Sequence, residues 1–529
     1  MKIMHSFRRA ICLFPFIGTS DASPIQKHED ACQRTKVVIL GAGIAGITAA
    51  QALHNQSISD FIILEYQGDI GGRIHKAEFG RGPDGKPYTV EYGANWAQGL
   101  GRPGGPENPV WTFEKKWNVA NTPSNTSNVE FFNELGRADF GDEIQDFEEA
   151  VRRLKVDAGE ILAENLQDRT VREGLSLVGW KPQQRANPAA AEAAEWWLWD
   201  GEQATTPEES SLVFGAAVSN FTFGQFSEES NFVIDQRGHN TWLKGEASTF
   251  LKPQDPRLKL NRIVTDVYHS NEGVIVETDS GGCVQADYAI CTFSLGVLQH
   301  DNVAFEPALP KWKKTAIEMF HMSTYTKIFM QFDRNFWGDK QFFLYADPVQ
   351  RGWYPIFQSL DAEGFFPGSH ILFVTVTQRE AYRVERQSEE ATKAQVMEVL
   401  RNMFPKETVP DPIAFAYPRW STTPWAYGSY SNWPPATSLD MHQNLRANVD
   451  RLWFAGEHTS ASHFGYMQGA WFEGQDVGNR IGRLIQGNCA EERAGDCGEM
   501  VHYDVLRGTT PSSSYGVQNG WPGSSMVDG

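Results

Sequence analysis

The feature that most constrains the fold is a glycine-rich turn between a short apolar run and a helix-like segment. Residues 36–40 (KVVIL) are typical of a strand buried on both faces, and residues 41–53 continue with small and apolar residues at helical spacing. The turn carries a G-x-G-x-x-G pattern at Gly41, Gly43 and Gly46, with Ala45 inside it. This strand–turn–helix order predicts a βαβ unit whose helix start binds a pyrophosphate.

A second buried run, residues 61–64, ends at Glu65, where an acidic residue can accept hydrogen bonds from ribose hydroxyls. An ordinary strand-end carboxylate is the alternative interpretation of Glu65. Residues 80–85 and 99–104 match the same glycine pattern, but both contain proline and neither opens a helix, so we expect turns there. Gly72 and Arg73 follow the second strand. Arg73 could pair with a phosphate or form a buried ion pair, and the spacing does not decide between them.

Length and charge exclude several classes of protein. The chain has 529 residues, more than the roughly 250–300 that one hydrophobic core usually serves, so we expect two domains or one large α/β unit with a second lobe. Its net charge of −19 disfavours a nucleic-acid partner. After the N-terminal region it contains no run of eighteen apolar residues, which predicts no membrane span. Six cysteines form no C-x-x-C pair, so we expect no metal site.

The two ends of the chain differ from the rest. Residues 1–22 combine basic residues, a short apolar run and small residues, which is typical of a signal peptide and favours secretion, with a cytoplasmic location as the alternative. Three sequons, at Asn55, Asn125 and Asn220, give mild support to a secreted glycoprotein. Residues 488–529 are rich in Ser, Gly and Pro and predict a flexible tail. Cys489 and Cys497 could close a small loop within that tail or remain free thiols.

The periodicity of the chain predicts interleaved α/β domains. Residues 139–202 read as amphipathic helix with a Trp-dense run, and 231–305 as short strands. Residues 324–332 alternate as a strand, 391–404 and 468–486 read as helices, and 452–455 as a buried strand. We therefore expect a Rossmann-like nucleotide-binding domain from residues 34–111, 228–315 and 420–487. A second domain with a mixed sheet and helices would comprise residues 112–227 and 316–419.

Several motifs together resemble the flavin-containing amine oxidases. They are the glycine fingerprint, residues 69–74 (DIGGRI), 93–96 (GANW) and 454–459 (FAGEHT). Residues 325–329 (YTKIF), 235–238 (DQRG) and 431–434 (SNWP) are similar to the polyamine oxidases of plants and fungi. The resemblance extends from about residue 36 to residue 489, and the set is far more specific than any single motif.

The resemblance implies an extended FAD held without a covalent bond, since no cysteine lies near residues 454–459. Val264 would contact the adenine and Glu457 the ribitol or phosphate region. The last helix would open beneath the flavin at Gly465, Tyr466 and Met467, where its N-terminus favours the negative charge of reduced flavin. The remaining residues that the family motifs assign to FAD are Gly72, Arg73, Ala94, Asn95 and Trp96.

The same resemblance assigns the catalytic site. Lys327 matches the lysine that holds a water against the flavin, whereas the residue pattern alone would favour a strand lysine with its ammonium in solvent. Tyr430 and Tyr466 match the aromatic pair that flanks the substrate amine, and Tyr325 and Trp420 are weaker candidates for the same pocket. Without the resemblance these aromatic residues would be assigned to the core.

One position departs from the family pattern. Plant polyamine oxidases carry an acidic residue shortly after the Asn-Trp pair, where this chain has Gln98; Glu202 is a looser match to a second acidic position. A Gln side chain accepts a hydrogen bond from an ammonium but adds no charge. The leading hypothesis is oxidation of spermine or spermidine by hydride transfer to flavin, with release of an aminoaldehyde, an amine and hydrogen peroxide.

Other functions remain open. Gln98 makes oxidation of a secondary-metabolite amine the second hypothesis, and a catalytically silent FAD-binding interaction protein is the non-enzyme alternative. The expected partners are a small amine and O₂, with a monomer favoured.

Overall fold

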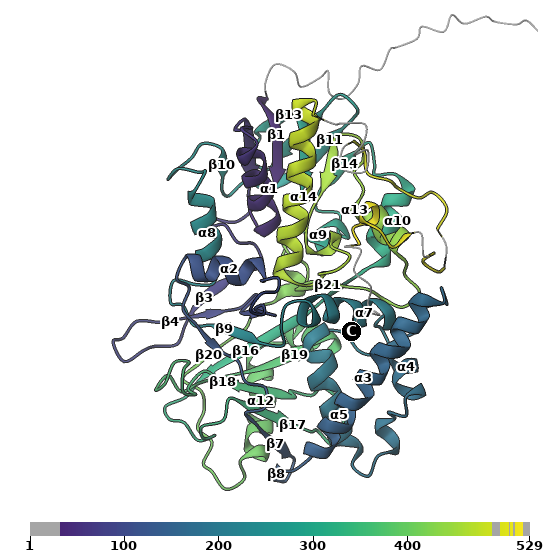
Figure 1. Cartoon of the computed structure of the whole chain (residues 1–529). Helices are drawn as coiled ribbons and strands as arrows, with labels where there is room; N and C mark the ends of the chain where they lie inside the picture. Colours follow the sequence, from purple (N-terminus) through teal and green to yellow (C-terminus); the bar gives the residue numbers. More distant parts are fainter. Residues whose placement is uncertain (1–31, 489–497, 507, 512–513, 522–529) are drawn as a thin grey trace, which may run out of the picture.

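The computed structural model describes residues 32–488, 498–506, 508–511 and 514–521 and contains two large sheets, one above the other in Figure 1. The eight-stranded sheet has the order β10-β2-β1-β13-β12-β11-β14, with β22 also paired to β13. Strands β2, β1, β13 and β22 run parallel, and the first two are buried where they pair, as expected of strands covered on both faces. The strands of this sheet are β1 (Gln33–Leu40), β2 (Phe61–Leu64), β10 (Leu258–Lys259), β11 (Val264–His269), β12 (Val274–Thr278), β13 (Cys283–Cys291), β14 (Ala304–Glu306) and β22 (Leu452–Phe454).

Two helices, α1 (Ile44–Asn55) and α14 (Met467–Gln486), pack side by side against this sheet (Figure 1). Glycines on α14 bring the two backbones into contact. A Cβ at Gly474 would lie 2.4 Å from the Ala45 carbonyl oxygen, and one at Gly478 would lie 2.6 Å from that of Ala49. Since the contacts advance along both helices together, α1 and α14 run parallel and their N-termini face the same edge of the sheet.

The seven-stranded sheet has the order β20-β16-β19-β18-β17-β7-β8 and forms the lower half of Figure 1. The predicted alternation of the strand at 324–332 is confirmed. Ile328 and Met330 face the core beneath helices α11 and α12, while Phe329 packs on the opposite side with Phe79 and Phe373. The elements of this half are β7 (Val129–Asn133), β8 (Gly136–Ala138), β16 (Tyr325–Gln331), β17 (Phe342–Tyr345), β18 (Ile356–Ser359), β19 (Ile371–Thr377), β20 (Ala414–Ala416), α11 (Gln378–Arg386) and α12 (Glu389–Met403).

A helical block flanks this sheet at the right of Figure 1. It consists of α3 (Gly141–Ala163), α4 (Val171–Leu177), α5 (Pro188–Glu195), α6 (Gly201–Gln203) and α7 (Leu212–Ser219), with π-helical turns at η3 (Trp196–Asp200) and η4 (Asn220–Gly224). The predicted helical character of residues 139–202 is therefore confirmed. π-helical turns are rare, and here each one precedes or contains residues that line the central cavity.

The remaining elements lie outside the two large sheets and the helical block. They are β3 (Lys76–Phe79), β4 (Tyr88–Glu91), β5 (Trp96–Gln98), α2 (Pro109–Lys116), β6 (Asn121–Pro123), η2 (Pro182–Gln184), β9 (Ser230–Val233), α8 (Thr241–Ser248), α9 (Leu295–Leu298), α10 (Lys311–Met319), β15 (His321–Ser323), η5 (Trp420–Thr422), β21 (Tyr430–Asn432), α13 (Leu439–Arg446), η6 (Glu457–Thr459) and η9 (Val517–Asn519). The fold is thus the mixed α/β architecture expected from the sequence, with the strands of each sheet drawn from interleaved parts of the chain. Residues 80–85 and 99–104 open no helix, as predicted.

The C-terminal region departs from the prediction. A flexible tail over residues 488–529 is wrong for the described part, because Met500, Asn519 and Trp521 are buried against the protein. The sequence also gave no indication of the disulfide between Cys32 and Cys283, which ties the start of β1 to the start of β13. The predicted signal peptide and the Cys489–Cys497 pair lie outside the described residues.

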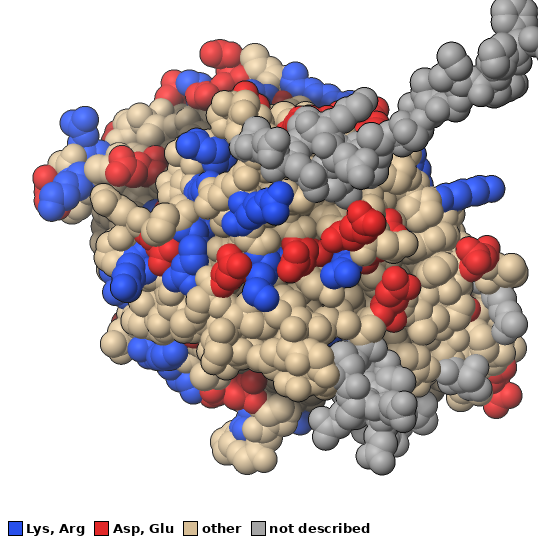
Figure 2. Space-filling model, turned by 90° about the horizontal axis from the view of Figure 1, so that it is seen from above, with Lys and Arg blue, Asp and Glu red and all other residues tan. Residues whose placement is uncertain are grey.

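Surface charge is dispersed on the face seen from above. Lys and Arg side chains alternate there with Asp and Glu instead of gathering into a patch of one sign (Figure 2). Among the described residues, none of the helices has the length and apolar character that a membrane crossing requires.

Candidate active site

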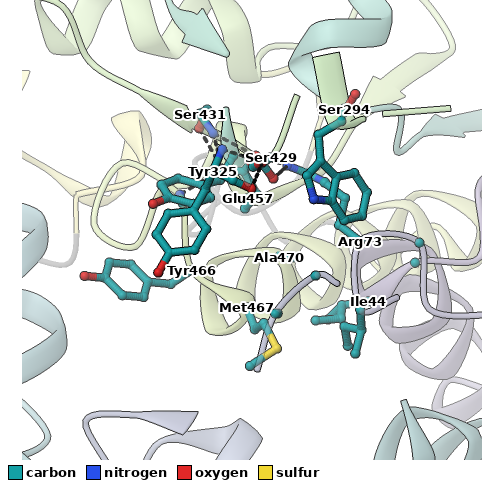
Figure 3. Close-up of a pocket in the computed structure, with 18 of the residues that line it drawn as sticks. Ile44, Arg73, Ser294, Tyr325, Ser429, Ser431, Glu457, Tyr466, Met467 and Ala470 are labelled. Carbon is teal, nitrogen blue, oxygen red and sulfur yellow. Dashed lines mark hydrogen bonds and ion pairs between the residues drawn. The ribbon is translucent and has the colours of Figure 1, made fainter. Parts of the chain in front are cut away.

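One cavity of about 740 Å³ lies between the two halves of the molecule and is lined by both. Its walls include Gly43 and Glu65 from the first βαβ unit, Tyr466 from the start of α14, and Glu202 from the helical block. The cavity therefore joins the nucleotide cradle to an aromatic chamber. Figure 3 shows Tyr325 and Tyr466 on one side of the view and Ser294 on the other.

The nucleotide end has room where a ligand must approach the backbone. A Cβ at Gly43 would meet only the Gly71 carbonyl oxygen, at 4.0 Å, so this glycine leaves open space toward the cavity. Helix α1 begins there with no side-chain cap, which leaves its first N–H groups available for an anion. Ala45 and Val264 also line this end.

Gly46 has a different role from the cofactor contact that the pattern assigned to it. It does not line the cavity, and a Cβ there would lie 2.0 Å from the Gly41 carbonyl oxygen. Gly46 therefore lets the helix approach the preceding turn, which supports the cradle.

Glu65 is fixed by backbone donors. One carboxylate oxygen accepts a 2.6 Å hydrogen bond from the Ala42 N–H, and the other accepts a 2.8 Å bond from the Gln67 N–H. Burial nevertheless raises the pKa of the Glu65 carboxyl, with these two bonds opposing the shift. Because each oxygen retains a further lone pair, the held carboxylate can still accept from ribose hydroxyls in the cavity.

Arg73 and Glu457 form an ion pair at the centre of the cavity wall. The guanidinium Nη1 lies 2.7 Å from a Glu457 carboxylate oxygen and donates a 2.9 Å bond to the Ser429 carbonyl. The other Glu457 oxygen accepts bonds from the Ser431 hydroxyl at 2.6 Å and the Gly465 N–H at 2.8 Å. Burial alone would raise the pKa of Glu457, but the charge of Arg73 and these bonds lower it overall. The sequence left open whether Arg73 binds a phosphate or forms a buried ion pair, and the structure contains the ion pair.

The Glu457 carboxylate thereby holds the turn that opens α14. Gly465 has φ +80°, a left-handed conformation that favours glycine, and Tyr466 and Met467 follow it directly. Helix α14 also lacks a side-chain cap. Two uncapped, parallel helix N-termini thus face one cavity, and Ile44 and Met467 mark their first residues in Figure 3.

Lys327 is buried, so the alternative favoured by the residue pattern alone, a strand lysine with its ammonium in solvent, is wrong. Its Nζ donates to the Gly93 carbonyl at 2.8 Å and to Asn95 Oδ1 at 3.3 Å, and it lies 5.4 Å from the centre of the Trp96 ring. Lys327 stands behind the cavity wall, which residues 93–96 form. Burial lowers the pKa of the Lys327 ammonium to about 7, opposed by the charge of Glu91.

A hydrogen-bonded group surrounds Glu202 at the other end of the cavity. The Gln98 amide donates to both Glu202 carboxylate oxygens, at 3.0 and 3.2 Å, and the Tyr466 hydroxyl donates to one of them at 2.5 Å. The Tyr430 hydroxyl donates to the Glu202 backbone carbonyl at 3.0 Å. Burial raises the pKa of the Glu202 carboxyl, and the bonds from Tyr466 and Gln98 oppose that rise. The sequence-predicted pair Gln98 and Glu202 is therefore in direct contact.

Aromatic rings complete this chamber. The rings of Tyr325 and Tyr430 lie 6.3 Å apart, and Phe223 packs edge-on to Tyr466 at 6.3 Å. Desolvation raises the pKa of Tyr325 to about 12, so its hydroxyl stays neutral. Trp420 also lines the cavity, but it packs on Trp425 and His75 and makes no hydrogen bond to the Glu202 group.

Sequence reasoning missed several lining residues. Ser429 and Ser431 hold the Arg73–Glu457 pair, and Trp197 and Phe342 add to the aromatic wall. Ser431 belongs to a quoted motif, so its position was available as a signal. Trp197 and Phe342 carried no signal beyond apolarity. Within the described residues, no group of three or more His, Cys, Asp or Glu side chains is arranged to hold a metal ion.

A nucleotide cradle joined by one cavity to a chamber for a small molecule defines a dinucleotide-dependent oxidoreductase. The chain belongs to the family described as flavin containing amine oxidoreductase, whose model matches residues 44–481. The resemblance to flavin-containing amine oxidases is thereby confirmed. A flavin fits the residues present, given the open space at Gly43 and the two helix N-termini.

Known relatives agree with this assignment. Polyamine oxidase 6 of Oryza sativa subsp. japonica is 37% identical over 516 residues, covering 94% of this chain and 98% of the relative. Polyamine oxidase 1 of Zea mays is 36% identical over 481 residues, covering 87% and 91%. A solved structure of a putrescine oxidase variant matches with a TM-score of 0.65 at 16% identity, over 85% of this chain and 99% of that one, which supports the fold.

Proposed function

We propose that this flavin amine oxidase acts on polyamines of the spermine and spermidine type. The observation that carries the proposal is the Glu202 carboxylate, set among Tyr325, Tyr430 and Tyr466 in the chamber that opens onto the nucleotide cradle. A buried carboxylate beside aromatic faces suits an alkyl ammonium, through charge pairing and cation–π attraction. The names of the Oryza and Zea relatives support the same substrate class.

The protein's own groups orient the amine and control its protonation. Glu202 anchors one nitrogen of the substrate, and the Tyr430 and Tyr466 rings confine the chain beside it. Lys327, neutral in much of its population near pH 7, adds no full charge that would repel a cation. A bound flavin would supply the redox chemistry: it would accept a hydride from the carbon next to the amine nitrogen, and O₂, reduced to hydrogen peroxide, would reoxidise it.

We propose FAD bound without a covalent link. The free cysteine of the described part of the chain, Cys291, is buried and does not line the cavity. The α1 N-terminus would hold the phosphates, Glu65 the ribose and Val264 the adenine. Acid precipitation should release all the flavin into the supernatant, and mass spectrometry should identify it as FAD. Flavin that stays with the precipitated protein would contradict this proposal.

The test of function is peroxide release by purified holoenzyme with spermine and spermidine, followed by identification of the aldehyde and amine products. We expect both polyamines to be turned over and to bleach the flavin anaerobically. Bound flavin that no amine bleaches would overturn the assignment and favour a non-catalytic FAD protein.

A second candidate substrate is a less highly charged amine, and Gln98 is the observation that favours it. Gln98 supplies a neutral amide where the plant family has an acid, so a single carboxylate, Glu202, lies in the deep chamber. A comparison of kcat/KM for monoamines, diamines and polyamines distinguishes the two candidate substrate classes. A kcat/KM that falls as positive charge is added would favour the second candidate.

We further propose that the protein is secreted. The Cys32–Cys283 disulfide is typical of an oxidising compartment, and the sequon residues Asn55 and Asn125 are exposed. Asn220 is half-buried within a π-helical turn and its Thr222 is fully buried, so we expect no glycan there. Expression in a eukaryotic secretory host, with intact mass before and after enzymatic deglycosylation, checks this. Retention in the cytosol would contradict it.

A further inference from the structure

We propose that Trp521, in the C-terminal segment, is a positioning residue that holds the wall of the amine chamber from outside. Its path to the chamber is short. Trp521 packs edge-on to Phe221 with ring centres 5.1 Å apart, and Phe221 lies in the π-helical turn η4. Two residues further on, Phe223 lines the cavity and packs on Tyr466, whose hydroxyl donates to Glu202.

The described C-terminal segment is built to fix Trp521. Asn444 of α13 exchanges two hydrogen bonds with the backbone of Tyr503, at 2.7 and 2.8 Å. The Tyr503 hydroxyl donates to Asn519 Oδ1 at 2.9 Å, and the Asn519 amide donates to the Ser514 carbonyl at 2.8 Å. Asn519 is fully buried and Trp521 is 4% exposed. The segment that carries Trp521 is therefore held by partly buried hydrogen bonds that begin at Asn444 of α13.

Trp521 reaches the other half of the molecule. Besides Phe221 it contacts Phe214 of α7, at 6.5 Å between ring centres, and both belong to the helical block beside the second sheet. The segment thus joins α13 of one half to α7 and η4 of the other. Since the cavity lies between these halves, a bridge at this point fixes the spacing of its walls.

The π-helical turn explains why outside support matters. Single i→i+5 turns are rare and occur frequently at functional sites. In η4 the turn directs Phe221 outward to Trp521 and places Phe223 in the cavity wall. The ring of Phe221 packs on Trp521 at 5.1 Å and on His463 at 6.1 Å between ring centres. Without the indole, Phe221 keeps only the more distant contact with His463, and we expect η4 to relax toward regular helix and shift Phe223.

The test compares Trp521→Ala, Trp521→Phe and the matched control His502→Ala. His502 lies in the same segment, but its ring stacks on Trp312 of the nucleotide-binding half, 4.4 Å away. Phe223 and Tyr466 line the chamber that the proposed function assigns to the amine. Loss of the indole should therefore raise KM about 2- to 10-fold with little change in kcat, the equivalent of one aromatic contact. Trp521→Phe should restore most of KM, and His502→Ala should leave it unchanged.

Hydrogen exchange separates this inference from the proposed function on which the kinetic measurement rests. Trp521→Ala should accelerate exchange in residues 219–226 while flavin content stays at the wild-type level, whether or not any amine is oxidised. Unchanged exchange in residues 219–226 of Trp521→Ala would show that the positioning role is wrong. So would an unchanged KM accompanied only by a lower melting temperature, if His502→Ala shows the same pattern. Accelerated exchange without turnover of any amine would instead contradict the polyamine proposal alone.

Discussion

Replacing Gln98 with Glu would place a second carboxylate against Glu202 and tests the electrostatics of the chamber directly. The Gln98 amide nitrogen now lies 3.0 Å from a Glu202 oxygen, so the substitution converts a donor–acceptor contact into a pair of acceptors. Two unit charges about 3 Å apart repel by about 5.5 kcal/mol at an effective dielectric constant of about 20. This repulsion adds to the burial that already raises the pKa of the Glu202 carboxyl, so the pKa of one of the two carboxyls rises further above its ordinary value.

Gln98→Glu should therefore bind one proton at pH 7 in the resting enzyme and release it when an ammonium occupies the chamber. Calorimetric titration with a polyamine, repeated in buffers of different ionisation enthalpy, should report release of about one proton more than wild type. KM for spermine should fall as the pH rises from 7 to 9, beyond any change in wild type. Gln98→Leu is the control, since it removes the hydrogen bond without adding a carboxyl. Equal proton release in all three proteins would refute the contact between Gln98 and Glu202 in solution.

Three further perturbations test other parts of the structure. Because the pKa of Lys327 is lowered to about 7, its charge is lost as the pH rises through that value, and kcat/KM should rise with a step there that Lys327→Met lacks in a full pH profile. Gly478→Ala should destabilise by about 1–3 kcal/mol in chemical denaturation through overpacking against Ala49, whereas Gly159→Ala, where a Cβ meets nothing within 4 Å, should not. Cys32→Ser should cost about 2–4 kcal/mol, and a reductant should produce the same loss in wild type but none in the variant.

The local rules of the sequence predicted the first βαβ unit well, because its signals lie close together. The buried run at 36–40, the glycine turn and Glu65 fall within thirty residues, and each depends on backbone geometry that neighbouring residues determine. Contacts between distant segments carried no such signal. Arg73 and Glu457 were identified separately, yet only the fold shows that they neutralise each other. The Cys32–Cys283 bridge was missed for the same reason.

The prediction for the C-terminal segment was wrong because it depended on amino-acid composition. Its Ser, Gly and Pro content is what disordered chains share, so the pattern indicated a tail. Anchoring depends instead on a few side chains, among them Tyr503, Asn519 and Trp521, whose partners Asn444 and Phe221 lie far away in sequence. For Lys327 the motif was the better guide. Strand periodicity alone predicted an ammonium in solvent, whereas the family motif predicted a functional lysine, and the side chain is buried.

The net charge of −19 and the chamber make different contributions to recognition of a cation. The cavity wall contains four carboxylates, but Glu65 is held by backbone N–H groups at the nucleotide end and Glu457 is neutralised by Arg73. Glu202 remains in the deep chamber, and Glu228 is exposed. The electrostatic potential of the surface charges is screened within about 8 Å at physiological ionic strength. The negative surface therefore raises the local concentration of polycations without orienting them in the chamber. The orientation of the bound amine therefore depends on the Glu202 carboxylate. The Gln98 amide donates hydrogen bonds to that carboxylate and so partly offsets its negative charge.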